Sequence, residues 1–125
     1  MIKGLLLSAG LSVLATPSIS HEIYSGVHGK DTTPCCGAND CSATVYREKG
    51  GRFEFLTREK HWVVVPEDRI TFLPIPGDEL ASSPNHAHLC YRAASQYSSP
   101  DHVMSASDGS QSIYLYCAFI PPMGS

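Results

Sequence analysis

The chain has 125 residues, 42% of them hydrophobic and only 17% charged, and a formal net charge of −3. This length is sufficient for one compact domain and too short for two independent cores, and the low charge density favours an ordered β-rich or exported protein over a disordered one. The basic residues are scattered and give a phosphate backbone no surface to bind, so we expect no nucleic-acid partner.

Residues 1–20 have the layout of a secretory signal peptide. A lysine near the start is followed by the apolar run Leu5–Ala15 and then by a short end with small residues before Ser20. The apolar run is too short to cross a bilayer as a helix, so we expect no membrane span once the leader is removed. Cleavage after Ser20 fits the small-x-small rule better than cleavage after the alanine that ends the run. It would make His21 the N-terminus of an exported domain, residues 21–125, that acts in the periplasm or outside the cell.

Five cysteines, an odd number, stand in the exported part of the sequence. An oxidising compartment favours disulfides, so we expect two bridges and one spare thiol. Adjacent Cys35 and Cys36 cannot easily bond to each other. If one of them bridges to Cys117 and the other to Cys90, they tie the N-terminal arm to the two C-terminal strands and leave Cys41 as the free thiol. A local bridge between Cys36 and Cys41 is the main alternative.

Alternating and β-branched residues predict a mainly β fold. Residues 42–48 and 52–57 form a predicted hairpin, because the paired glycines between them suit a tight turn. A third strand is expected at 61–65, where a tryptophan and three valines precede a proline, and a short fourth strand at 70–73.

Two further strands are predicted in the C-terminal half. The stretch 86–92 alternates, so that one side carries Ala87, Leu89 and Tyr91 and the other carries His86, His88 and Cys90. The stretch 111–120 is apolar on both faces, as expected of a strand in the middle of a sheet. We expect loops at 78–85 and 93–110, and an irregular N-terminal arm at 21–33. These elements predict a small disulfide-stapled antiparallel sheet, barrel-like or sandwich-like.

Three histidines are candidate metal ligands. On a strand, His86 and His88 point to the same side about 7 Å apart, so their imidazoles can converge on one ion. If His21 is the mature N-terminus, its amine and imidazole can chelate an ion together, and His86 or His88 supplies the rest. Such donors suit copper or zinc, the one kind of cofactor that the sequence suggests. The alternative interpretation is that the pair lies on a solvated strand face.

No catalytic pattern is present, so we expect no enzymatic function. The sequence has no CxxC, no GxSxG and no HExxH, and its Ser, His and Asp residues have no spacing typical of a triad. Trp62, Tyr114 and Tyr116 could form a platform for a sugar, but on strands this apolar we expect them to pack in the core.

The chain resembles a group of small, uncharacterised exported bacterial proteins. The residues that carry the resemblance are His21–Tyr24 after the leader, the cysteine cluster Cys35–Cys41 (a CCxxxDC pattern), Trp62–Pro66 and the later His88–Cys90. It covers the chain from the end of the leader to Cys90. The resemblance implies export and a shared cysteine framework, and it implies no activity.

The sequence therefore predicts an exported, disulfide-stabilised, non-catalytic binding domain. Its partner would be an unknown protein or a small ligand. The alternative prediction is a periplasmic copper or zinc binder that uses His21 with His86 or His88.

Overall fold

The computed structural model describes residues 10, 23–29, 34–35 and 40–122. As predicted, these residues are mainly β, with only two turns of 3₁₀ helix. In chain order the elements are β1 (Cys41–Lys49), β2 (Arg52–Leu56), β3 (Trp62–Val65), η1 (Glu67–Arg69), β4 (Ile70–Thr71), β5 (His86–Ala93), η2 (Pro100–His102), β6 (Val103–Ser105) and β7 (Ser112–Phe119).

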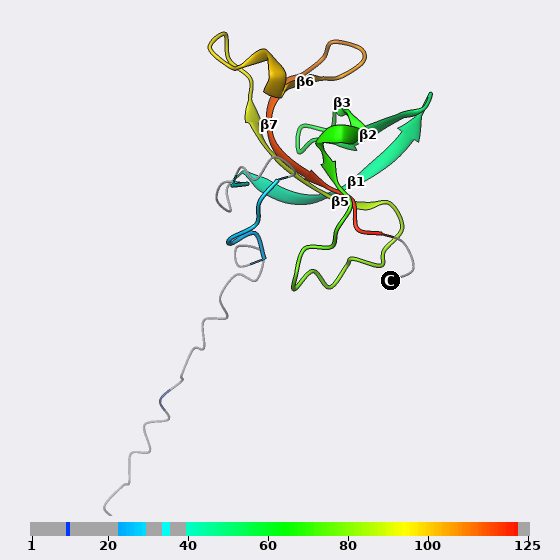
Figure 1. Ribbon diagram of the computed structural model, residues 1–125, viewed down its shortest axis with the longest axis vertical. Coiled ribbons are helices and arrows are strands. Elements are labelled where there is room, and N and C mark those ends of the chain that lie inside the picture. Colours follow the sequence, from blue (N-terminus) through cyan, green and yellow to red (C-terminus); the bar gives the residue numbers. More distant parts are fainter. Residues whose placement is uncertain (1–9, 11–22, 30–33, 36–39, 123–125) are drawn as a thin grey trace, which may run out of the picture.

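The strands form one curled sheet in the order β3-β2-β1-β5-β7-β4, and β6 also pairs with β7 (Figure 1). All pairs are antiparallel except β4 with β7, so the sheet is mixed where an antiparallel one was expected. Strand β1 pairs with β5 through its first half and with β2 through its second half. An isolated bridge between Val63 and Ala106 joins β3 to the end of β6. The sheet therefore closes into a half-barrel around its core.

The predicted hairpin is confirmed as β1–β2. Its turn contains Gly50 and Gly51, with φ values of 60° and 76°. Positive φ at both central residues defines the tight turn that matches the twist of an antiparallel hairpin, and glycine adopts it without strain. The long polar loop expected at 93–110 is interrupted by η2 and by the short strand β6, which the Ser-rich composition concealed.

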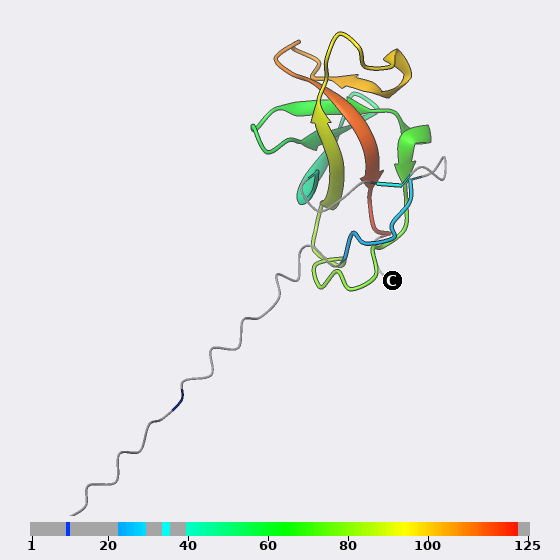
Figure 2. The same ribbon diagram turned by 90° about the vertical axis from the view of Figure 1, so that its left-hand side faces the viewer.

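Strand β5 alternates as predicted, but both of its faces are buried. Ala87, Leu89 and Tyr91 point into the barrel core. His86 and His88, on the other face, are only 7% and 1% exposed. They are covered by the N-terminal segment 23–29 and by the loop between β4 and β5, which lie at the same end of the molecule in Figures 1 and 2. The interpretation of this face as solvated is wrong.

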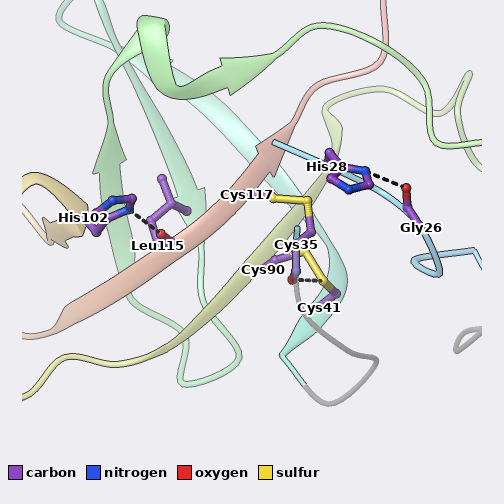
Figure 3. The surroundings of a disulfide bond; sticks show 8 residues. All are labelled: Gly26, His28, Cys35, Cys41, Cys90, His102, Leu115 and Cys117. Atoms are coloured by element: carbon purple, nitrogen blue, oxygen red, sulfur yellow. Dashed lines mark hydrogen bonds between the residues drawn. A yellow bond between two sulfur atoms is a disulfide. The ribbon is translucent and has the colours of Figure 1, made fainter. Parts of the chain in front are cut away.

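Two disulfides lie on this covered face of the sheet (Figure 3). One joins Cys35 to Cys117 and the other joins Cys41 to Cys90. The prediction that Cys41 is the free thiol is wrong, because β1 begins at Cys41 and places it directly opposite Cys90 in the β1–β5 register. A local bridge from Cys36 to Cys41 is excluded for the same reason, and Cys36 itself lies outside the described residues.

Around the two disulfides, a second and smaller core packs on the outer face of the sheet. It consists of Tyr24, Cys35, Cys41, Ile75, Cys90, Cys117 and Phe119. This core fixes the N-terminal segment and the β4–β5 loop against β5 and β7. Two disulfides are compatible with an oxidising, exported location. Within the described ranges, the chain has no helix of the length and apolar character that a membrane crossing requires.

Candidate metal centre

Asp78, His86 and His88 converge on the outer face of the sheet. The carboxylate Oδ2 of Asp78 lies 2.8 Å from Nε2 of His86 and 2.6 Å from Nε2 of His88. One donor atom from each of the three residues lies within 4.8 Å of the others. The three side chains are only 5%, 6% and 1% exposed, respectively. Three metal-ligating groups are thus gathered in a nearly dry place.

A tight turn aims Asp78 at the sheet. The backbone N–H of Asp78 donates to the carbonyl of Ile75, and Pro76 and Gly77 occupy the central positions. Gly77 has a φ of 85°, which a type II turn requires at its third residue. A Cβ there would also meet Cγ2 of Ile23 at 3.2 Å. Glycine is therefore needed both for the turn and for the close approach of the N-terminal segment.

The strand places the two imidazoles. His86 and His88 are two residues apart on β5, so both point to the same face, and their ring centroids lie 4.8 Å apart. Asn85, with a φ of 58°, turns the chain into the strand. Asparagine tolerates this left-handed conformation better than most residues.

Hydrogen bonds hold the cluster on both sides. The second carboxylate oxygen of Asp78, Oδ1, accepts from the backbone N–H of Leu80 at 3.1 Å. On the other side, the hydroxyl of Tyr24 lies 2.8 Å from Nδ1 of His88. Since an ionised carboxylate only accepts hydrogen bonds, each histidine presents Nε2–H to Asp78. Nδ1 of His88 then accepts the hydroxyl proton of Tyr24.

The electrostatics agree with this assignment. Burial acts to raise the pKa of Asp78, but hydrogen bonds from His88, the Leu80 N–H and His86 outweigh it and lower the pKa below its usual value. Burial lowers the pKa of His88, against the opposing effect of Asp78. Burial, with the nearby charge of Asp78, raises the pKa of Tyr24 to about 12. The centre therefore holds an ionised carboxylate, a neutral imidazole and a protonated phenol, the forms in which Asp and His bind metals.

A cavity of about 410 Å³ opens beside this cluster. Asp78 and His88 form part of its wall, together with Tyr24. The rest of the lining includes the apolar residues Ile23 and Ala43. This volume lies within the range of small-molecule binding sites, and two members of the cluster lie on its wall.

Two of the three predicted metal ligands are brought together. His86 and His88 converge as their spacing indicated, whereas His21 lies outside the described residues. Asp78 was missed, because residues 78–85 were assigned to a loop on composition alone. The Pro76-Gly77-Asp78 turn, placed shortly before the His-x-His pair, was the feature that could have found it.

The other candidate residues do not join a site. His28 is exposed, and its Nδ1 contacts the carbonyl of Gly26. Trp62, Tyr114 and Tyr116 are half-buried and lie outside the main core, so the expectation that they pack in the core is wrong. The guanidinium of Arg47 lies over Trp62, and Tyr114 packs against His102 and Tyr116.

Comparison with protein-family models, with curated proteins and with solved structures found no match to this chain. The resemblance to small exported bacterial proteins therefore stays a prediction.

Proposed function

We propose that the chain is an exported, disulfide-stabilised, non-catalytic binding domain whose ligand is a divalent ion of the zinc or copper class, held by Asp78, His86 and His88. The main support is the convergence of three nearly buried donor atoms within 4.8 Å. Imidazole and carboxylate donors suit both ions. Hydrogen bonds to Tyr24, to the Leu80 N–H and within the cluster hold the three side chains in place, and a bound ion would replace the bonds within the cluster.

The hydrogen-bonded cluster must rearrange to take the ion. Zinc binds nitrogen and oxygen ligands at about 2.0–2.2 Å, so neighbouring ligand atoms around a tetrahedral ion lie about 3.3 Å apart. The hydrogen bonds from His86 and His88 to Asp78 are 2.8 and 2.6 Å long. The carboxylate therefore withdraws by roughly 0.6 Å on binding.

Binding also requires a change of tautomer, and Tyr24 supports it. When Nε2 of His88 binds the ion, its proton moves to Nδ1. The hydroxyl of Tyr24, which donates to Nδ1 in the hydrogen-bonded cluster, can accept from Nδ1–H instead. Outer partners of this kind orient metal-binding histidines.

Calorimetric titration of the purified, oxidised protein with Zn²⁺ and with Cu²⁺ tests the proposal. The wild type is expected to bind one ion. Asp78→Asn is expected to lose more than the roughly 10- to 100-fold in affinity that loss of an outer partner causes. His28→Ala is the matched control, because it removes an exposed imidazole outside the cluster, and it should keep wild-type affinity.

NMR spectra of the imidazole nitrogens in the wild type give a second test, which does not require that Asp78→Asn folds. On adding Zn²⁺ to the wild type, we expect the Nε2 signals of His86 and His88 to shift and those of His102 to stay in place. Unchanged signals in both rings would overturn the proposal. A folded Asp78→Asn protein that binds Zn²⁺ and Cu²⁺ with wild-type affinity would also overturn the proposal.

A second form of the proposal adds His21 as a ligand. Its amine and imidazole become available together only if the leader is removed after Ser20. Mass spectrometry of the mature protein determines whether His21 is the N-terminus. If it is, His21→Ala decides its role: reduced affinity makes it a ligand, and unchanged affinity leaves the three-residue site.

A further inference from the structure

The cavity beside the centre has a small residue, Ala43, next to His88 on its wall. In the β1–β5 register, Ala43 lies directly opposite His88. Directly opposed residues of an antiparallel pair have Cβ atoms about 4.5–5.5 Å apart, so a large side chain at position 43 would cover the imidazole. Alanine leaves this space open, and Ala43 is exposed although its neighbour Cys41 on the same face is buried.

The cavity has a polar end and an apolar body. Asp78, His88 and Tyr24 form the polar end. Ile23 and Ala43 contribute apolar surface, and so does Leu80, which is 56% exposed. A ligand that fills this space would have a donor group at one end and a small apolar group at the other.

Three protein ligands leave a coordination position open on a tetrahedral ion. A divalent ion together with the ionised Asp78 carries a net charge of +1, so the open position favours an anionic donor. The other carboxylate at the cavity, Glu79, is exposed and therefore solvated by water. The positive charge of the ion therefore outweighs the negative charge of Glu79 at the polar end of the cavity.

We infer that the cavity binds a small apolar carboxylate, whose carboxylate group coordinates the ion on Asp78, His86 and His88 and whose apolar part lies against Ile23, Ala43 and Leu80. This inference rests on the proposed metal function. It makes the ion the anchor for an organic ligand and assigns specificity to the residue at position 43.

Benzoate is the probe, with benzyl alcohol as the neutral compound of similar shape. Zinc-loaded wild type is expected to bind benzoate at least about tenfold more tightly than it binds benzyl alcohol, and at least about tenfold more tightly than the metal-free protein binds benzoate. Equal binding of benzoate with and without Zn²⁺ would overturn the inference.

Ala43→Phe is compared with Leu73→Phe. Leu73 is 62% exposed, and only Ala43 lines the cavity. Ala43→Phe is expected to weaken benzoate binding at least about tenfold, since even one extra methylene in a filled apolar pocket has such an effect. Leu73→Phe should keep both the Zn²⁺ affinity and the benzoate affinity of the wild type.

The Zn²⁺ titration tests the metal function, and the benzoate titration tests the inference about the cavity. Absence of Zn²⁺ binding in the wild type overturns the metal function and this inference with it. Normal Zn²⁺ binding with no benzoate binding, or with benzoate binding that Ala43→Phe leaves unchanged, overturns the inference alone.

Discussion

The hydroxyl of Tyr24 lies 2.8 Å from Nδ1 of His88, although 64 positions of the chain separate the two residues. This contact joins the N-terminal segment to the candidate metal centre, where it fixes the orientation of a buried imidazole. Tyr24 is itself buried, at 6% exposure. The N-terminal segment is therefore part of the centre as well as its cover.

Tyr24→Phe should weaken Zn²⁺ binding about 10- to 100-fold, as loss of an outer partner does. It should lower the free energy of unfolding by about 1 kcal/mol, because one buried hydrogen bond is lost while the ring still packs. Calorimetric titration and urea unfolding measure the two effects. Tyr97→Phe, at a tyrosine that is 88% exposed, is the control and should change neither. Wild-type Zn²⁺ affinity in Tyr24→Phe would show that the hydroxyl does not support the centre.

Gly77→Ala should be more destabilising than Gly109→Ala. Both glycines have positive φ, 85° and 74°, so both substitutions introduce about 1–2 kcal/mol of backbone strain. Only the new Cβ at position 77 meets a neighbour, Cγ2 of Ile23 at 3.2 Å, whereas position 109 has open space. Gly77→Ala should also reduce Zn²⁺ affinity, because the turn that aims Asp78 is disturbed. Urea unfolding and metal titration of the two variants test this, and equal effects at both positions would contradict it.

The strand pattern of the sequence predicted much of the fold, because alternation and glycine turns are local properties. It placed His86 and His88 on one face of a strand for the same reason. The sequence could not reveal what covers that face, since cover depends on contacts between distant segments. A strand paired on both sides and packed on both faces buries its polar side as completely as its apolar side.

Asp78 and Cys41 were misjudged for a shared physical reason. Cys41 stands where a turn meets the sheet, and Asp78 stands in a loop that packs on the sheet, so in both cases contacts with distant residues decide the role and local composition does not show it. The predicted strand began at residue 42, yet Cys41 is the first residue of β1 and pairs with Cys90. Asp78 was assigned to a loop, yet its carboxylate contacts β5.

Removing either disulfide should lower stability substantially. The bridges Cys41–Cys90 and Cys35–Cys117 span sequence separations of 49 and 82, worth about 4 kcal/mol each if chain entropy alone acts. We expect double alanine variants of either pair to lose about 2–4 kcal/mol in the free energy of unfolding, measured by urea denaturation. Cys36→Ala is the control and should leave stability unchanged, because both bridges use the other four cysteines.

Peptide mapping without reduction tests the same pairing directly. It should recover the peptide containing Cys41 linked to that containing Cys90, and the peptide containing Cys35 linked to that containing Cys117. A map in which Cys41 carries a free thiol would refute the pairing, whatever the stability of the variants.

Release of the Tyr91 proton should lower the free energy of unfolding at alkaline pH. Burial, assisted by the adjacent carboxylate of Glu59, raises the pKa of this phenol against the opposing effect of Arg58. Its hydroxyl donates to Glu59 and accepts from the backbone N–H of Arg58 at 2.8 Å. An unfolded tyrosine releases its proton near pH 10, while the folded protein retains it to higher pH. The unfolded state is therefore favoured as the pH rises from about 10 through the raised pKa, and the contribution of Tyr91 to stability is complete only below about pH 10.

Tyr91→Phe separates this effect from other causes of alkaline unfolding. At pH 8 the variant should be less stable by about 1 kcal/mol, because the hydrogen bonds to Glu59 and Arg58 are lost. Between pH 9 and 11 its free energy of unfolding should fall less steeply than that of the wild type, because the group that released the proton is absent. Urea unfolding at a series of pH values measures both quantities. Parallel pH profiles for variant and wild type would mean that the Tyr91 phenol does not hold its proton more tightly in the folded state.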